Sequence, residues 1–170
     1  MASKNESHRE TQITGPLTLG SLFDGIGVFP LAASRHGIVP RWASEIEKAP
    51  ISITKRHFPH MEHLGDITKL DGGTIPAVHI ITFGSPCQNL SKMGDRTGLA
   101  GAKSSLFYQA IRIIQEMRDA TGDQFPIIAV WENVIYALKH ITDVMCRKQL
   151  CKAPPKNAEK QHHQALFLCT

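Results

Sequence analysis

Apolar runs of five to seven residues alternate with glycine-rich or polar turns along most of the chain. The runs at 80–84 and 125–131 are rich in β-branched residues, as expected of strands that are buried on both faces. The sequence predicts strands at 17–23, 41–45, 80–84 and 125–131, and a brief strand followed by a turn over 62–67. Apolar residues spaced three or four apart predict helices over 29–36, 49–58 and from Ser104 onwards. Because strands and helices alternate, we expect an α/β fold, a Rossmann-like, doubly wound parallel sheet with helices on both faces.

Each predicted helix has an apolar face that we expect to pack against the sheet. In the first two helices the predicted inward residues are Phe29, Leu31, Ala32, Ala33, Ile51, Ile53, Thr54 and Phe58. In the third helix they are Phe107, Ala110, Ile111, Ile114 and Met117. A last amphipathic stretch contains Leu138, Ile141, Met145 and Leu150.

The polarity of the chain predicts one domain with two polar ends. Residues 1–16 are expected to form a flexible lead-in, 17–150 the domain, and 151–170 a disordered polar tail. Residues 88–103 have no sustained apolar period and are expected to form a long loop, which in a compact domain is usually functional or disordered.

The first candidate for chemistry is Cys87. The strand at 80–84 is broken by Gly84-Ser85-Pro86, since proline lacks a backbone donor and glycine permits unusual dihedral angles. Cys87 therefore follows the carboxyl end of a strand, where open α/β sheets bind their ligands. This position makes Cys87 a candidate nucleophile, although a lone intracellular cysteine is more often a small buried hydrophobe.

Three further features follow the other strands. Phe23-Asp24-Gly25-Ile26-Gly27 is a strand-to-helix turn in which backbone can approach a ligand closely, although by itself it is equally well a structural turn. Glu45 lies 20 residues after Gly25, where an acid accepts hydrogen bonds from ribose hydroxyls or is simply a solvated charge. Asp66 is placed to accept from an adenine amino group or to cap a helix.

Glu132 follows the apolar run 127–131, so it lies at the end of a strand predicted to neighbour the strand before Cys87. Parallel strands end at the same edge of a sheet, and we therefore expect Cys87 and Glu132 to converge on one pocket.

Composition narrows the class of protein. No apolar run approaches the length of a membrane span, and the polar residues 1–10 predict no signal peptide. The four cysteines form no C-x-x-C pair, which favours a cytoplasmic protein with free thiols. The net charge of +4 is carried by residues 147–170, with five basic residues and one acid, so it gives no independent argument for DNA binding. His57, His60 and His63 span a proline-broken turn and predict no metal site.

Five blocks, in order and spacing, resemble the motifs of DNA (cytosine-5) methyltransferases over residues 17–134. The blocks are Phe23-Asp-Gly-Ile-Gly27, Gly65-Asp-Ile-Thr68, Gly84-Ser-Pro-Cys-Gln-Asn-Leu-Ser91, Leu106-Phe107 and Glu132-Asn-Val134. The resemblance implies a Cys87 thiolate that adds to carbon 6 of a flipped-out cytosine in double-stranded DNA, with Glu132 at ring nitrogen 3 and Asn133 in the catalytic motif. It implies S-adenosyl-L-methionine as the methyl donor. Residues implied to bind that cofactor or line the pocket are Phe23, Asp24, Gly25, Ile26, Gly27, Glu45, Asp66, Ile67, Pro86 and Leu106.

The family's Gln-x-Arg-x-Arg element, target-recognition domain and closing motifs are not found in the sequence. The chain therefore resembles a truncated N-terminal catalytic half, which we expect to need a second chain for recognition of DNA. The alternative is an inactive remnant or a non-catalytic binding fragment. A cysteine hydrolase that pairs Cys87 with one of nine histidines is a weaker hypothesis, because it leaves Gly25, Glu45 and Asp66 unexplained.

Overall fold

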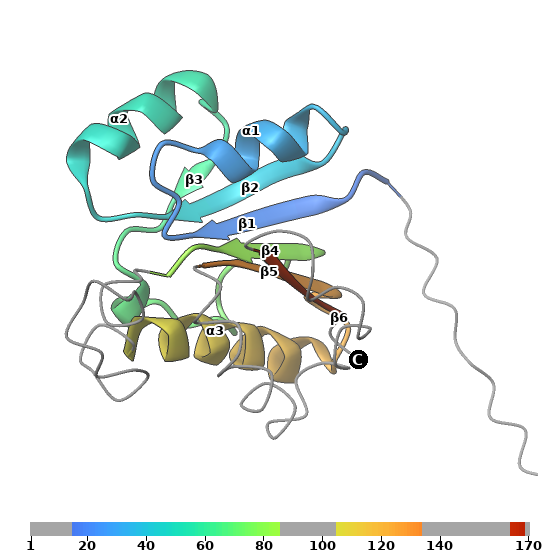
Figure 1. Ribbon diagram of the computed structural model, residues 1–170. Helices are drawn as coiled ribbons and strands as arrows, with labels where there is room; N and C mark the ends of the chain where they lie inside the picture. The colour runs from blue at the N-terminus through green and yellow to red at the C-terminus, as the bar shows by residue number, and fades with distance from the viewer. Residues whose placement is uncertain (1–14, 86–104, 134–163, 169–170) are drawn as a thin grey trace, which may run out of the picture.

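A computed structural model gives the fold over residues 15–85, 105–133 and 164–168. Six strands form one sheet in the order β3-β2-β1-β4-β5-β6 (Figure 1). The strands are β1 (Thr18–Leu22), β2 (Val39–Ser44), β3 (Glu62–His63), β4 (Ile80–Phe83), β5 (Ile128–Glu132) and β6 (Gln164–Leu168). The first five pair in parallel, and β6 pairs antiparallel with β5 at the edge.

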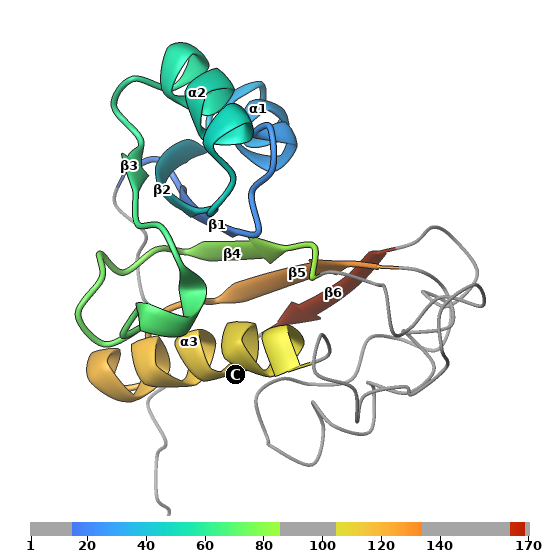
Figure 2. The ribbon, with the colours of Figure 1, turned by 90° about the vertical axis from the view of Figure 1, so that its left-hand side faces the viewer.

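Helices cover both faces of this sheet. α1 (Val28–Ser34) and α2 (Lys48–His57) lie on one face, and α3 (Ser105–Thr121) lies along the other (Figures 1 and 2). A short 3-10 helix, η1 (Ile67–Lys69), follows β3. The prediction of a doubly wound parallel sheet is therefore confirmed. Its strand order reverses between β1 and β4, the position at which such sheets bind ligands beyond the carboxyl ends of their strands.

The larger core lies between the sheet and α3. All five residues predicted to face inward on this helix are buried, and Phe107 packs on Trp131 with ring centroids 5.1 Å apart. Trp131 also stacks on Phe83 of β4, at 6.4 Å and 25° between ring planes. The ends of β4 and β5 are thus fixed against α3 by aromatic packing.

The other face differs from the prediction. Leu31 of α1 and Ile53 of α2, both expected to face inward, are 45% and 41% exposed. The buried positions are small or polar: Ala33 in α1 and Thr54 in α2, both predicted to face inward, and Pro30, which was not. Small residues allow close approach: a Cβ atom on Gly27 would lie only 2.8 Å from Thr54 Cγ2. The apolar spacing therefore predicted these two helices and the burial of Ala33 and Thr54 correctly, but it placed Leu31 and Ile53 inward where they are exposed.

The strand boundaries differ at both ends of the predicted runs. β3 contains Glu62 and His63, which agrees with the brief strand and turn predicted over 62–67, whereas β5 begins at Ile128 instead of Phe125. Pro126 lacks the backbone N–H that a ladder requires, and regular pairing with β4 starts two residues later. The strand also includes Glu132, which was expected to follow it.

The C-terminal segment gives a second correction. Residues 164–168, predicted to belong to a disordered tail, form β6 and pair with β5 from Ile128↔Leu168 to Glu132↔Gln164. The sheet therefore extends beyond the predicted domain boundary at residue 150. The amphipathic stretch predicted after Leu138 and the loop predicted over 88–103 lie outside the described residues. Within the described ranges, no helix is long and apolar enough to cross a membrane.

Candidate functional site

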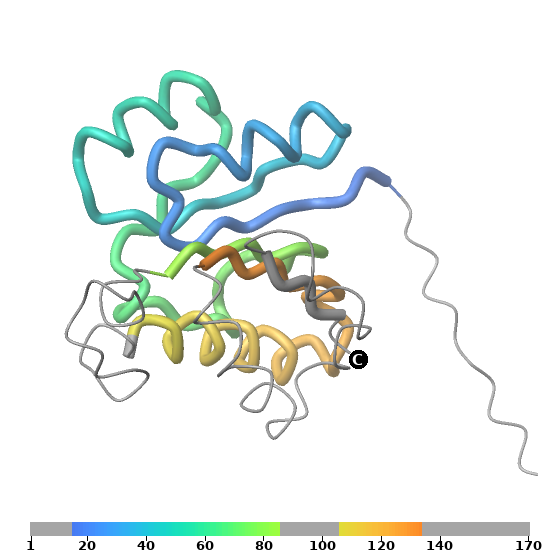
Figure 3. Tube along the Cα trace, viewed as in Figure 1, coloured from blue at the N-terminus to red at the C-terminus, as the bar shows by residue number. Residues whose placement is uncertain are grey.

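The turns after β1 and β2 are joined by one carboxylate. Glu45, the first residue after β2, accepts a hydrogen bond from the Gly25 backbone N–H at its Oε2 atom, at 2.8 Å. Its Oε1 atom accepts from the backbone N–H groups of Ile46 at 2.7 Å and Glu47 at 3.0 Å. Figure 3 shows the chain leaving both strands at the same edge of the sheet. The structure therefore brings together the glycine turn and the acid predicted to face it.

The backbone of the glycine turn is left-handed at alternate residues, with φ of 55° at Phe23, 57° at Gly25 and 83° at Gly27. Positive φ is uncommon for a residue with a side chain, so the backbone of Phe23 is in an unfavourable conformation. Packing of the Phe23 side chain against the larger core, between the sheet and α3, stabilises this conformation. Ile26, by contrast, is 56% exposed at the tip of the turn. The turn thus presents backbone and one apolar side chain outward.

Gly27→Ala should destabilise the protein by about 2 kcal/mol more than Gly37→Ala, its control. Both glycines have left-handed φ, 83° and 73°, so both substitutions incur a similar conformational cost. Only the Cβ at position 27 meets a close neighbour, Thr54 Cγ2, whereas nothing lies within 4 Å of a Cβ at position 37. Urea denaturation of the two variants measures the difference, and equal losses would contradict close packing of the turn on α2.

Asp24, inside the same turn, is a buried acid. It is 5% exposed, and neither carboxylate oxygen has a hydrogen-bond partner among the described residues. Burial is the main reason that the pKa of Asp24 is raised from 3.8 to about 6. The Ser21 hydroxyl lowers the pKa, although it lies outside hydrogen-bond geometry, and the charge of Glu45 raises it. A buried carboxylate without a partner is costly, which marks it as a group in need of a donor or cation.

Two buried hydroxyls near the switch point also lack partners within the described part of the chain, Ser21 Oγ on β1 and Thr82 Oγ1 on β4. These residues are register partners on neighbouring strands. The sequence prediction missed both, because a serine and a threonine within apolar runs carry no signal of their own.

Asp66 is tied to the other turns indirectly. The Ser44 hydroxyl at the end of β2 donates to the Gly65 carbonyl at 2.7 Å. Asp66 Oδ1 accepts from the backbone N–H and the hydroxyl of Thr68, at 2.9 and 2.8 Å, and so caps η1. These two bonds from Thr68 hold the pKa of Asp66 below its ordinary value. The helix-cap alternative is therefore realised here, while Ile67, next to it, is buried in the main core.

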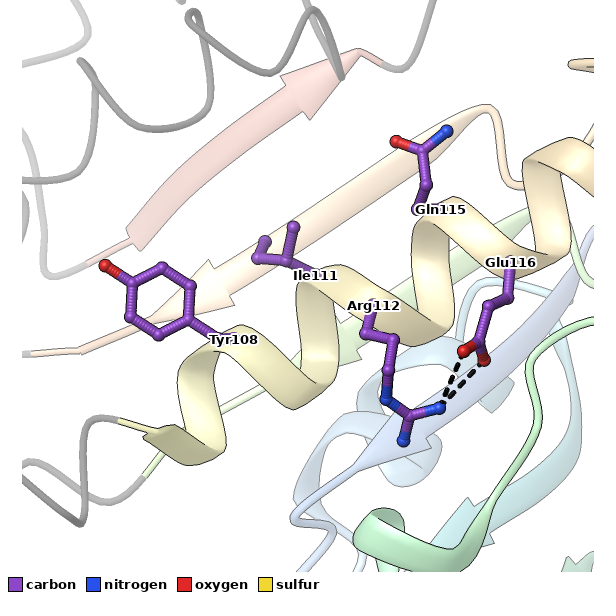
Figure 4. A pocket seen from close by; sticks show the side chains of 5 residues that line it. All are labelled: Tyr108, Ile111, Arg112, Gln115 and Glu116. Atoms are coloured by element: carbon purple, nitrogen blue, oxygen red, sulfur yellow. Dashed lines mark hydrogen bonds and ion pairs between the residues drawn. The ribbon is translucent and has the colours of Figure 1, made fainter.

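Arg112 of α3 fixes the same segment from the other side. Its guanidinium donates to the carbonyl oxygens of Ile67 at 3.0 Å and Leu70 at 2.8 Å and pairs with Glu116 (Figure 4). Figure 4 also shows a pocket on α3, lined by Tyr108, Ile111, Arg112, Gln115 and Glu116. Its two charged residues are occupied by these structural contacts, and it contains none of the predicted site residues.

The ends of β4 and β5 hold the second group of predicted residues. Glu132 is exposed, and its Oε2 would lie 3.2 Å from a Cβ on Gly84. Asn133 is buried, and its Nδ2 donates to the Ser85 carbonyl at 2.8 Å. Pro86 and Cys87 lie outside the described residues. Leu106, near the start of α3, is partly buried against the main core.

The described site residues thus form two groups near the carboxyl ends of the strands, one beyond β1, β2 and β3 and one, Glu132 and Asn133, at the end of β5, while Leu106 lies near the start of α3. Sequence reasoning also missed Ile46, which directly follows Glu45 and is 66% exposed. Ile26, which follows Gly25, and Ile46 are thus exposed apolar side chains next to residues joined by the Glu45 hydrogen bond. Only its position after a predicted site acid could have indicated Ile46.

Known methyltransferases are similar to this chain in sequence and in fold. Residues 17–152 match the C-5 cytosine-specific DNA methylase family. The chain is 31% identical over 126 residues to the type II methyltransferase M.HhaI of Haemophilus parahaemolyticus, covering 74% of this chain and 36% of that protein. It is 33% identical over 124 residues to the DNA N-6-adenine-methyltransferase of Escherichia phage P1, covering 69% and 16%.

The solved structure of S. pombe Dnmt2 methyltransferase is similar, with a TM-score of 0.57 at 20% identity over 78% of this chain and 40% of that one. A Dnmt2 variant from Spodoptera frugiperda gives 0.54 at 22% identity, over 78% and 38%. The chain spans only 16% to 36% of the two curated relatives' lengths. With most of its residues matched, the chain belongs to the C-5 cytosine-specific DNA methylase family.

Proposed function

We propose that this chain carries the cofactor-binding and catalytic part of a DNA cytosine-5 methyltransferase that uses S-adenosyl-L-methionine. The observation that carries the proposal is the Glu45 carboxylate, held 2.8 Å from the Gly25 N–H beside a buried, unpartnered Asp24. Membership of the family and the strand order of the sheet support the same assignment.

The chemistry of the site fits the cofactor group by group. The unpartnered Asp24 carboxylate, with Ser21 and Thr82 nearby, would receive the ammonium group of the methionine part. Glu45 would accept from the ribose hydroxyls with the lone pairs that its backbone bonds leave. The exposed Ile26 and Ile46 and the ring of Phe23 would contact the adenine, whose amino group Asp66 would bind. Gly25, Gly27 and Ile67 would shape this cradle. The cofactor supplies an electrophilic methyl group.

The catalytic step is proposed for the second group. Carbon 5 of cytosine is a poor nucleophile, so the Cys87 thiolate would add to carbon 6 and make carbon 5 enamine-like. Glu132 would hold or protonate ring nitrogen 3, where charge develops during the attack. Its exposure beside Gly84 agrees with this role, because a base must reach the carboxylate. After methylation the carbon 5 proton leaves and the thiolate is eliminated.

The substrate would be double-stranded DNA with the target cytosine flipped out of the helix. Pro86 and Leu106 would line the base pocket. We propose that a second chain supplies recognition of the DNA. The alternative is a non-catalytic fragment or an inactive remnant.

The wild-type chain should bind S-adenosylmethionine, and Glu45→Gln should weaken binding by about tenfold or more, because a charge-assisted acceptor is lost. Isothermal titration calorimetry measures this affinity. Glu47→Gln is the matched control, since it removes the same charge from an exposed residue two positions away and should bind as the wild type does.

Equal affinities in the two variants would exclude the ribose assignment of Glu45. A folded wild-type chain that binds no cofactor would instead favour the non-catalytic fragment. Cofactor binding by the wild type and by Glu47→Gln, with weaker binding by Glu45→Gln, would support the assignment. The search would then turn to the complementing chain.

A further inference from the structure

One arginine of α3 binds both ends of the 3-10 helix η1. The Arg112 Nη2 group donates to the carbonyl of Ile67, the first residue of η1, at 3.0 Å. Its Nη1 group donates to the carbonyl of Leu70, the residue that ends η1, at 2.8 Å. A side chain of α3 therefore sets where η1 lies, and η1 begins directly after Asp66.

The guanidinium is itself held in place. Its Nε group donates to Gln109 Oε1 at 2.8 Å, and its Nη1 group pairs with Glu116 Oε1 at 2.8 Å (Figure 4). Glu116 Oε2 also accepts from the Gly72 backbone N–H at 2.7 Å, just beyond η1. A Cβ on Gly72 would overlap the Ile113 carbonyl oxygen, so the backbone lies directly on α3 here. The planar fork of arginine can serve all these acceptors at once, whereas a lysine ammonium is a single point of donation.

Asp66 depends on η1 for the direction of its carboxylate. Its Oδ1 atom accepts from the backbone N–H and the hydroxyl of Thr68, at 2.9 and 2.8 Å. Within the described part of the chain both of its hydrogen bonds fall on Oδ1, so Oδ2 remains to accept from a ligand. A shift of η1 would move Thr68 and with it the carboxylate.

We infer that Arg112 is a positioning residue for adenine recognition, because it holds η1 where Asp66 can accept from the adenine amino group. The inference rests on the proposed function, in which Asp66 binds that group. Arg112 acts through two backbone carbonyls of η1 and is assigned no contact with the cofactor. A carboxylate placed in this way favours an amino group over a carbonyl oxygen at the same ring position, since the carbonyl offers no donor.

The test measures the preference of the protein for S-adenosylhomocysteine over S-inosylhomocysteine, in which a carbonyl oxygen replaces the amino group. Isothermal titration calorimetry gives both affinities. The wild type should prefer the adenosyl compound by about tenfold or more. Arg112→Lys keeps the charge but not the fork, and it should lower this preference by about threefold or more. A purely structural role would weaken both ligands equally and leave their ratio unchanged.

Arg118→Lys is the matched control. Arg118 is a buried arginine further along the same helix, and it likewise donates to a carbonyl, that of Pro126 at 3.1 Å, and pairs with an acid, Asp123. These contacts lie away from η1, so the preference should stay at the wild-type value. Gln109→Met, which removes one acceptor of the Arg112 guanidinium, should lower the preference and replaces Arg112→Lys if that variant does not fold.

A second measurement needs no cofactor. The two hydrogen bonds from Thr68 hold the pKa of Asp66 below its ordinary value, and the charge of Lys69 lowers it further. Titration of the Asp66 carboxyl by NMR should show this pKa rising towards its ordinary value in Arg112→Lys and unchanged in Arg118→Lys. Because lysine keeps the positive charge, the rise would report the geometry of η1.

The outcomes separate the inference from the proposed function. A wild type that prefers the adenosyl compound, with the same preference in Arg112→Lys, would overturn the inference and leave the proposed function standing. A wild type that binds both compounds equally would remove Asp66 from the adenine, and the inference would fall with that assignment. A folded chain that binds neither would count against the proposed function. The pKa of Asp66 would then decide the inference, and an unchanged pKa in Arg112→Lys would overturn it.

Discussion

Asp24→Asn should raise the free energy of unfolding by about 2–3 kcal/mol at pH 7.5. Burial raises the pKa of Asp24 from 3.8 to about 6, and each unit corresponds to about 1.4 kcal/mol. The folded protein therefore binds this proton more tightly than the unfolded chain does. Asparagine has nearly the shape of the neutral acid and carries no charge to bury. Urea denaturation of both proteins measures the difference.

The pH dependence tests the cause of this gain. A raised pKa in the folded state means that the wild type loses stability as pH rises from about 4 through 6, and the penalty is complete above that. The advantage of Asp24→Asn should therefore vanish near pH 4 and be constant above about pH 7. A gain that is independent of pH would contradict burial of the charge.

Asp66→Asn is the matched control, with the opposite sign. Hydrogen bonds from Thr68 lower the pKa of Asp66, so its ionised form stabilises the fold above the unfolded pKa and that stability is lost as pH falls. The same substitution at position 66 should thus destabilise the protein at neutral pH.

Asp24→Asn should also weaken cofactor binding, because the proposed partner of the ammonium group is gone. For the wild type, affinity should fall roughly tenfold per pH unit below about pH 6, as Asp24 takes up a proton. If Asp24→Asn is more stable than the wild type but binds the cofactor less tightly, the buried Asp24 charge lowers folding stability and contributes to cofactor binding. Unchanged affinity would remove Asp24 from the proposed cradle.

The sequence predicted the sheet well because buried parallel strands are continuous apolar runs, and α3 because its apolar residues face a large core. In α1 and α2 the burial of Ala33 and Thr54 was predicted, whereas Leu31 and Ile53 were placed inward and are exposed. The contact between the turn and α2 depends on close approach at Gly27 and Thr54, which a pattern of large apolar residues does not report. β6 was missed because an edge strand of five residues inside a polar segment carries little periodicity.

The candidate site was predictable where a residue type at a given spacing from a motif has few alternative roles. An acid 20 residues after a glycine turn is such a signal, and Glu45 does contact Gly25. The exposure of Glu132 and the burial of Asp24 depend instead on tertiary packing, which the local sequence does not report. The bonds from Arg112 to η1 join residues 45 and 42 positions apart, which no local pattern connects.

Cys87→Ser should reduce methyl transfer to DNA cytosine by about a thousandfold or more, because a serine hydroxyl is far less ionised than a thiol at neutral pH. The fold should not change, since the substitution replaces one atom. Methyl transfer from labelled S-adenosylmethionine to duplex DNA measures the rate. Persisting activity in this variant would exclude Cys87 as the nucleophile.

A covalent adduct separates the chemical step from turnover. Fluorine at carbon 5 of cytosine cannot leave as the proton does, so DNA containing 5-fluorocytosine should trap the protein once carbon 5 has been methylated. The adduct should form with the wild type and with Cys146→Ser, and not with Cys87→Ser. If the wild-type chain forms none with cofactor and DNA present, the non-catalytic fragment is favoured. An adduct formed by the wild type and lost in Cys87→Ser would show that this chain, about a third of M.HhaI in matched length, contains the reacting groups.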